Sequence, residues 1–152
     1  MIVAAVGKPR EPLAAAIREY ETRAARYWPL DVVEVREEAA RSGTTAEQVR
    51  EREGERLAEK LPGGAHVVAC EIEGRRLSSE QFSAWLQGER ERGQDVAFVI
   101  GGAFGLGAGV RGRARTMLSM APWTLPHELA RLVLAEQLYR AGSIVRGEPY
   151  HK

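Results

Sequence analysis

The sequence predicts an α/β fold, a sandwich in which a mostly parallel sheet is flanked by helices. Residues 1–6, 65–70 and 96–100 are short apolar runs with little alternation, which is typical of strands buried on both faces. Helical patterns separate these runs, so strands and helices alternate along the chain. A chain of 152 residues with no long linker and no internal repeat is expected to form one domain, residues 1–152.

The first part of the chain predicts a strand, a helix and a second strand. Residues 1–6 predict a buried strand that ends in a turn at Gly7-Lys8-Pro9. Residues 12–26 place their apolar side chains on one helical stripe. Residues 31–35 alternate and carry β-branched side chains, which favours a strand.

A charged helix is expected next, on the surface. Thr44 and Thr45 each precede a Glu or Gln by three residues, so either could open the helix with a capping box. The helix is rich in Glu and Arg and extends to about Leu61. Its charges are mixed in sign, which indicates a solvated, salt-bridged helix rather than an RNA-binding one. Pro62-Gly63-Gly64 is expected to end it.

The middle of the chain predicts a third strand and a third helix. Residues 65–70 predict the strand, and Ser78, with Gln81 three residues later, predicts a capped helix that ends at Gly93. The apolar residues of this helix are expected to face inward: Phe82, Trp85 and Leu86.

The last third predicts two more strands and the final helix. Residues 96–100 predict a buried strand, residues 110–115 a short basic helix, and residues 116–120 a last strand. Pro126 is expected to open the final helix at a first-turn position, where proline is tolerated. This helix is apolar almost all round, which suggests a buried subunit interface.

The composition narrows the class of protein. The formal net charge is +1, so nucleic-acid binding would need a local patch or two chains that pool their charges. Neither a signal peptide nor a membrane-spanning run is evident, and a cytoplasmic protein is the expectation. One cysteine forms no intrachain disulfide, and three scattered histidines suggest no metal site.

A glycine-rich loop follows the strand at 96–100. Its glycines are Gly101, Gly102, Gly105, Gly107 and Gly109. Their spacing matches neither a dinucleotide-binding nor a triphosphate-binding motif, and alone the loop could be a structural turn. Ligands in open α/β sheets bind outside the carboxyl ends of strands, where this loop and residues 70–74 are both expected. The sequence therefore predicts a ligand site there.

Other polar residues allow a functional and a structural interpretation. Cys70 ends an apolar strand, and we expect a small buried hydrophobe rather than a nucleophile. His127 lies in a first helical turn, where a neutral structural imidazole is favoured. Glu136 and Arg140 are four residues apart and could simply pair.

The tail Pro149-Tyr150-His151-Lys152 combines an aromatic ring, an imidazole and a cation. Such side chains can stack on a base, hydrogen-bond and bind phosphate, although a disordered tail is the alternative.

Four segments closely resemble the bacterial RlmH family, small methyltransferases of the SPOUT class that act on pseudouridine in 23S rRNA. They are residues 100–106, 124–127, 136–141 and 149–152, and the resemblance extends over the whole chain. It implies a SPOUT-type sandwich with a C-terminal trefoil knot, an exception to the rule that chains are unknotted. The glycine loop, the loop at 120–125 and the final helix would form the knot.

The resemblance also implies S-adenosyl-L-methionine as the cofactor, bound largely through backbone groups, and no metal. Carried over position by position, the cofactor-binding residues would be Cys70, Gly101, Gly102, Met120, Ala121, Pro122, Trp123, Thr124 and Leu125.

The implied reaction is methyl transfer to N3 of a pseudouridine in helix 69 of 23S rRNA, within the assembled 70S ribosome. Arg140, Tyr150 and His151 would form the RNA-side catalytic site. Tyr150 would stack on the base, Arg140 would hold phosphate or stabilise the deprotonated imide, and His151 could act as the base or only contact RNA. A homodimer is expected, in which the tail of one chain completes the cofactor site of the other.

Two alternatives remain open at this point. A SPOUT methyltransferase could act on another RNA such as tRNA, or the chain could be a non-catalytic ribosome-binding module.

Overall fold

The computed structural model describes residues 1–40 and 42–152, and its centre is a five-stranded parallel sheet. The strands are β1 (Ile2–Val6), β2 (Asp31–Val35), β3 (His66–Arg75), β4 (Val96–Ile100) and β5 (Thr116–Leu118). Their order across the sheet is β2-β1-β4-β3-β5. The predicted α/β fold with a parallel sheet is therefore confirmed.

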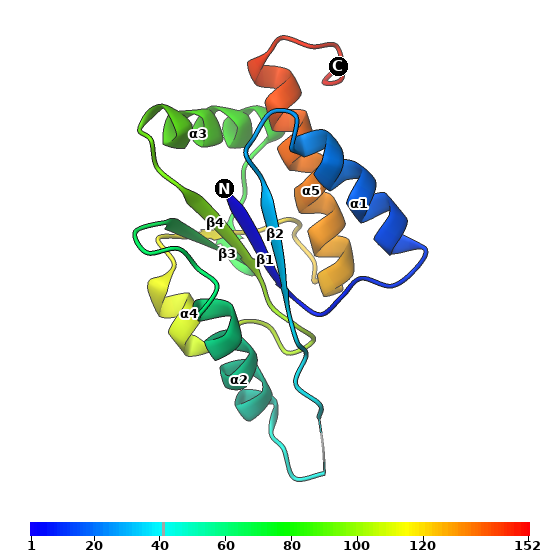
Figure 1. Cartoon of the computed structure of the whole chain (residues 1–152), viewed down its shortest axis with the longest axis vertical. Helices are drawn as coiled ribbons and strands as arrows, with labels where there is room; N and C mark the ends of the chain where they lie inside the picture. Colours follow the sequence, from blue (N-terminus) through cyan, green and yellow to red (C-terminus); the bar gives the residue numbers. More distant parts are fainter. Residues whose placement is uncertain (41) are drawn as a thin grey trace.

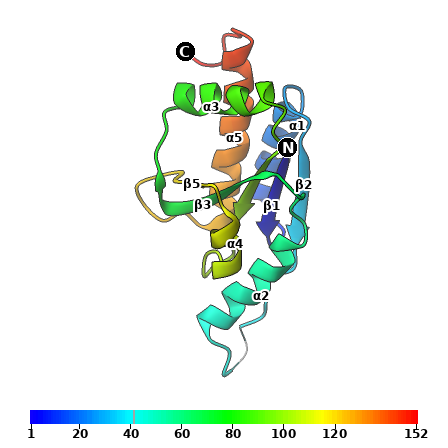
Figure 2. The same cartoon turned by 90° about the vertical axis from the view of Figure 1, so that its left-hand side faces the viewer.

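Helices cover both faces of the sheet (Figures 1 and 2). They are α1 (Leu13–Ala24), α2 (Ala46–Ala58), α3 (Ser79–Glu91), α4 (Ala108–Arg113) and α5 (His127–Val145). On one face α5 packs between α1 and α3, and on the other α2 packs on α4. No helix among the described residues is long and apolar enough to cross a membrane.

The two faces of the sheet form two separate hydrophobic cores. Successive residues of a strand point to opposite faces. Val3 and Ala5 of β1 therefore join the core under α1, α3 and α5, whereas Ala4 and Val6 join the core under α2 and α4. This explains why the central strands are continuously apolar in sequence.

Both predicted types of helix cap are present. The side chain of Thr45 accepts a hydrogen bond from the Gln48 amide, and Ser78 does the same for Gln81. Of the two capping boxes that the sequence allows before α2, the structure uses the one at Thr45.

Several boundaries differ from the prediction. β3 continues past Cys70 to Arg75, which pairs with Leu118 after a shift of register. The apolar pattern missed this extension because its side chains border a cavity and solvent instead of the core. β5 ends at Leu118, since the Ser119 hydroxyl then bonds to the Ala121 carbonyl and turns the chain. α5 begins at His127, with Pro126 as its N-cap.

The prediction for α2 is correct only in part. The helix carries many exposed charges, but one of its faces is buried against the second core through Val49, Glu53, Gly54 and Leu57. A buried glutamate on this face was not expected from the mixed charge pattern.

Candidate active site

A cavity of about 700 Å³ opens at the carboxyl ends of β3 and β4. Its size is in the range that small-molecule sites occupy. The extension of β3, the glycine loop, residues 120–126 and the start of α5 surround it. The cavity is lined by Cys70, Glu71, Ile72, Glu73, Ile100, Gly101, Gly102, Ala103, Gly105, Arg111, Met120, Ala121, Trp123, Thr124, Leu125, Pro126, His127 and Ala130.

The glycine loop folds back on itself to form one wall. Gly105 donates its amide hydrogen to the Gly102 carbonyl at 3.0 Å and has a φ of 84°, a conformation that favours glycine. A Cβ atom on Gly101 would lie 2.5 Å from the carbonyl group of Gly105. The wall therefore needs glycine at both positions and exposes backbone to the cavity.

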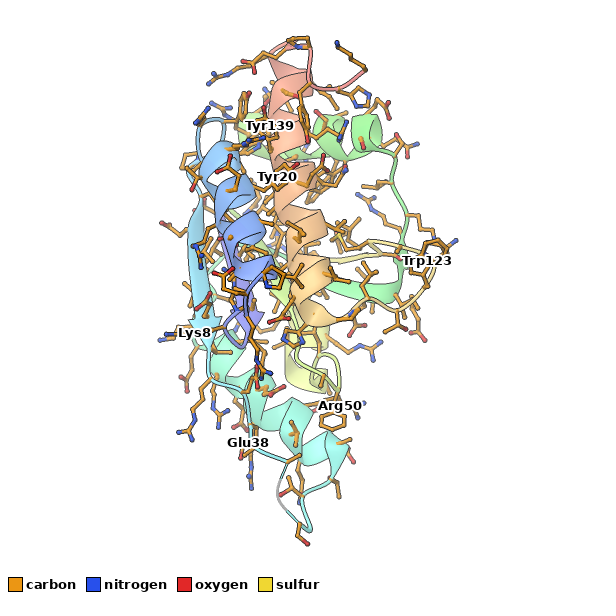
Figure 3. The ribbon with its side chains drawn as sticks, turned by 90° about the vertical axis from the view of Figure 1, so that its right-hand side faces the viewer. Lys8, Tyr20, Glu38, Arg50, Trp123 and Tyr139 are labelled. Carbon is orange, nitrogen blue, oxygen red and sulfur yellow. The ribbon has the colours of Figure 1, made fainter. Side chains whose placement is uncertain are left out.

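The segment after β5 forms the opposite wall. The Ser119 amide donates to the Arg75 carbonyl at 3.0 Å, which holds this segment on the extension of β3. Trp123 is 68% exposed, and its side chain projects outward from the loop (Figure 3). Of the predicted cofactor-binding residues, Pro122 alone does not line the cavity, and it is exposed.

Charged side chains also line the cavity. Arg111 of α4 forms ion pairs with Glu71 at 3.1 Å and Glu73 at 3.6 Å. Burial raises the pKa of Glu71, although Arg111 opposes this. The sequence placed residues 70–74 at the ligand edge of the sheet but gave Glu71 no role of its own. Its position directly after a buried strand is the signal that could have singled it out.

Cys70 is a poor candidate for a nucleophile. Burial of its thiol raises the pKa of Cys70 to about 12, so the reactive thiolate is scarce near neutral pH. The side chain packs against the core under α3 and α5. These features agree with its interpretation as a small hydrophobe that borders the cavity.

The three residues predicted for RNA chemistry meet at the far end of α5. Glu136 organises them, because its Oε1 atom accepts hydrogen bonds from Arg140 Nη2 at 2.6 Å and from the Tyr150 hydroxyl at 3.0 Å. The Arg140 guanidinium lies 4.7 Å from the centre of the Tyr150 ring. Arg140 Nη1 also lies 3.4 Å from Nδ1 of His151. The i,i+4 pair of Glu136 and Arg140 thus exists, and it also holds the tail.

Further contacts keep the tail in place. His151 Nε2 lies 2.8 Å from Oε1 of Glu80 on α3. Because Arg140 can only donate to Nδ1, these contacts match the tautomer with its proton on Nε2. The rings of Tyr139 and Tyr150 lie 4.5 Å apart, and Tyr20 lies beside Tyr139 (Figure 3). The tail is therefore packed, in contrast to the alternative of disorder.

Hydrogen bonds set the protonation of two groups in this cluster. The Ser78 hydroxyl, the backbone and His151 all bond to Glu80 and lower the pKa of its carboxyl to about 2. Burial raises the pKa of Tyr150, and its bonds to Tyr20 and Glu136 add to the effect. Near neutral pH the Tyr150 phenol is therefore neutral, and the Glu80 carboxylate that contacts His151 is ionised.

The cavity and the tail cluster are far apart in one chain. None of Arg140, Tyr150 and His151 lines the cavity, whereas His127 at the start of α5 does. Arg140 follows His127 by 13 positions on the same helix, or about 20 Å at a helical rise of 1.5 Å per residue. One chain alone does not bring the two predicted halves of the site together.

Known proteins resemble this chain over nearly its whole length. A family model described as "Predicted SPOUT methyltransferase" matches residues 1–151. A protein of Gemmatimonas aurantiaca named ribosomal RNA large subunit methyltransferase H is 63% identical over 148 residues, which are 97% of this chain and 96% of that protein. A protein of the same name from Listeria monocytogenes serotype 4b is 45% identical over 155 residues, 99% of this chain and 98% of that protein.

Solved structures share the fold. The crystal structure of TrmJ from Z. mobilis ZM4 matches with a TM-score of 0.52 and 20% sequence identity. The match covers 99% of this chain and 72% of that one.

Proposed function

The chain belongs to the SPOUT methyltransferase family, and from this premise we propose that it methylates ribosomal RNA of the large subunit. The observation that carries the proposal is the glycine-walled cavity at the carboxyl edge of the sheet, in a chain whose relatives are named as methyltransferases of that RNA. In its finer form, the target atom is N3 of a pseudouridine in helix 69 of 23S rRNA, within the assembled 70S ribosome.

The cavity suits S-adenosyl-L-methionine, which supplies a methyl group on a sulfonium centre. Backbone of Gly101 and Gly102 and of the segment from Met120 to Leu125 would hold the adenosine part, and Cys70 borders the same cavity. The lining carries two carboxyl groups, Glu71 and Glu73, against one guanidinium, Arg111, and this excess of acidic groups suits a cationic ligand. A Cβ atom at Gly101 would clash with the Gly105 backbone, so this wall keeps its shape only with glycine there.

The tail cluster provides what the acceptor needs. An imide nitrogen is a weak nucleophile until it loses its proton, so the protein must orient the base and remove that proton. Tyr150 offers an aromatic face for the base, and Arg140 offers a cation for phosphate or for a deprotonated imide. His151 is the proposed proton acceptor, through Nδ1, since its Nε2 atom donates to Glu80.

A homodimer would combine the two halves. The distance of about 20 Å along α5 separates the tail cluster from the cavity of its own chain. We therefore expect the tail of one protomer to lie over the cavity of its partner, with residues 1–152 acting as one unit. The partly exposed apolar side chains of α5 would contribute to the contact: Leu129, Leu132 and Val133. The C-terminal trefoil knot belongs to the same proposal.

Assembled ribosomes are the expected substrate because the chain has little charge of its own. The 22 Lys and Arg residues are nearly balanced by 21 Asp and Glu residues, so free RNA should bind weakly and in a salt-dependent way. A dimer would pool Arg111, Arg113, Arg115 and Arg140 from both copies.

Tritium transfer from labelled S-adenosylmethionine tests the proposal. The acceptors are 70S ribosomes that lack the modification, free 23S rRNA and tRNA, and the labelled nucleoside is identified after digestion. Label that appears only on ribosomes, as methylpseudouridine, supports the proposal in full. Label on tRNA would reassign the substrate, and cofactor binding without any transfer would indicate a non-catalytic module.

A further inference from the structure

Glu53 of α2 is a buried carboxyl side chain that the proposed reaction does not use. It is 4% exposed and lies on the inner face of a helix whose outer face is highly charged. Burial raises the pKa of Glu53. An acidic side chain in such a place is unfavourable unless it has specific partners.

One oxygen of this carboxyl group is anchored and the other faces the glycine loop. Oε1 accepts a hydrogen bond from the Glu38 amide at 2.9 Å, in the connection between β2 and α2. Oε2 is buried and has no hydrogen-bond partner among the described residues. A Cβ atom on Gly102 would lie only 2.6 Å from Oε2. Oε2 therefore packs closely behind Gly102, which is part of the cavity wall.

Neighbours of Glu53 on α2 support the next part of the same loop. The Ala108 amide donates to Glu51 Oε1 at 2.8 Å. A Cβ atom on Gly107 would lie 2.8 Å from the carbonyl oxygen of Arg50, which is labelled in Figure 3. Gly54 packs on Gly107 in turn, with 3.5 Å between the Cβ position of Gly54 and the Cα atom of Gly107. Residues 50–54 therefore pack against residues 102–108 and support them.

We propose that Glu53 is a positioning residue, which fixes Gly102 and so the cavity wall against which the methyl donor binds. The role in donor binding rests on the function proposed above, whereas the effect on the loop does not. Glu53 touches neither donor nor RNA and acts only through the glycine loop. Its carboxyl group contacts two connections, β2–α2 and β4–α4, whose strands lie on either side of β1, and sets the separation of these connections.

Hydrogen exchange of the ligand-free protein tests the first part. The amide of Gly105 is the reporter, because its bond to the Gly102 carbonyl holds the loop closed. Glu53→Ala should speed exchange about tenfold in a peptide that covers residues 101–107, because it removes the anchored carboxyl group that packs behind Gly102. Glu53→Gln keeps the shape and an acceptor for the Glu38 amide, so it should restore most of the protection. Glu55→Ala, on the exposed face of the same helix, is the matched control and should change nothing.

Calorimetry with S-adenosylmethionine tests the second part. Glu53→Ala should weaken binding about tenfold and Glu53→Gln much less, while the thermal melt shows that each variant is folded. Gly102→Ala should also weaken binding, because its methyl group meets Oε2. Combining it with Glu53→Ala removes that clash, so the double variant should lose less affinity than the two single losses predict together.

The results separate the two proposals. If folded Glu53→Ala exchanges residues 101–107 at the wild-type rate, the positioning role is wrong. It is also wrong if exchange is faster but the affinity for S-adenosylmethionine is unchanged. If the wild-type protein binds no S-adenosylmethionine, the proposed function fails, and the exchange experiment still decides whether Glu53 fixes the loop.

Discussion

Two carboxylates hold the residues of the tail cluster in place. Glu136 bonds to both Arg140 and Tyr150, and Glu80 bonds to His151 from another helix. Each side chain that we propose to act on RNA is therefore already oriented by a neighbour. Such preorganisation lowers the free energy needed to align the acceptor base.

Replacement of His151 tests its proposed role as a base. His151→Ala should lower the rate of methyl transfer by about a hundredfold, the usual contribution of a general base, with little change in donor affinity. Initial rates on ribosomes and calorimetry measure the two quantities. Lys152→Ala is the control on the same tail. A rate within twofold of wild type for both His151→Ala and Tyr150→Ala would remove the tail from the catalytic site.

The thiol of Cys70 should be unreactive in the folded protein. Its pKa of about 12 leaves a very small thiolate fraction at pH 8, so alkylation by iodoacetamide should be far slower than in urea. Mass spectrometry of timed samples measures both rates. Equal rates would mean that the thiol is not buried, and loss of methyl transfer in Cys70→Ser would give it a role that we do not expect.

The sequence predicted some site residues better than others, for a physical reason. Glycines after a buried strand are visible in sequence, and the cavity lies where they predicted. The burial of Glu53 was not predicted, because a carboxylate is ordinarily a surface group and only the fold shows that this one is enclosed. Assignment of the residues to donor binding stays a prediction.

At the scale of elements, the apolar pattern identified the central strands, whereas α2 was predicted from its caps and charges and its contribution to the second core was not expected. The pattern failed where an element leaves the core. The second half of β3 is polar because it borders the cavity. Few residues of α2 are buried, because most of that helix is exposed to solvent. Periodicity reports burial in a core, so a strand edge that serves a ligand gives no such signal.

Helix caps provide a direct test of two elements. Thr45→Ala and Ser78→Ala should each lower the free energy of unfolding by about 1 kcal/mol, because each removes an N-cap hydrogen bond. Urea denaturation measures the change. Thr44→Ala is the matched control and should have little effect, since the structure places the cap at Thr45. If Thr44→Ala lowered the free energy of unfolding more than Thr45→Ala, the N-cap would be Thr44 and α2 would begin one residue earlier.

The contact between Glu80 of α3 and His151 of the tail should weaken at acid pH. The pKa of Glu80 is about 2 in the folded chain and 4.5 ordinarily, so the folded state binds fewer protons in this range. Its stabilising effect is present above pH 4.5 and is lost as the pH falls through about 2. Urea midpoints at several pH values should show wild type and Glu80→Gln converging across this window. A constant gap between the two would contradict the prediction.

At the scale of the whole molecule, the two halves of the proposed site belong to opposite ends of α5. This separation predicts that two defective chains can repair each other. Gly101→Ala damages the cavity wall through its clash with Gly105, and His151→Ala damages the tail. Each variant alone should transfer little methyl group.

Mixed dimers of these two variants should contain one intact composite site. After subunit exchange at equal concentrations, half of the dimers are mixed, so the mixture should recover about a quarter of wild-type activity. Sedimentation measures the dimer, and tritium transfer measures the activity. An inactive mixture with proven exchange would mean that each chain uses its own tail.

The 19 residues of α5 set a fixed span between the cavity and the tail cluster. An insertion of four residues in this helix would move the tail by about 6 Å, too far for a base to remain at the methyl donor. The turn at Pro62–Gly64 differs, because a side chain at Gly63 or Gly64 would meet open space and extra residues there would loop into solvent. Natural insertions and deletions should therefore occur in such turns rather than in α5. In α5 they would be selected against even when the helix still folds.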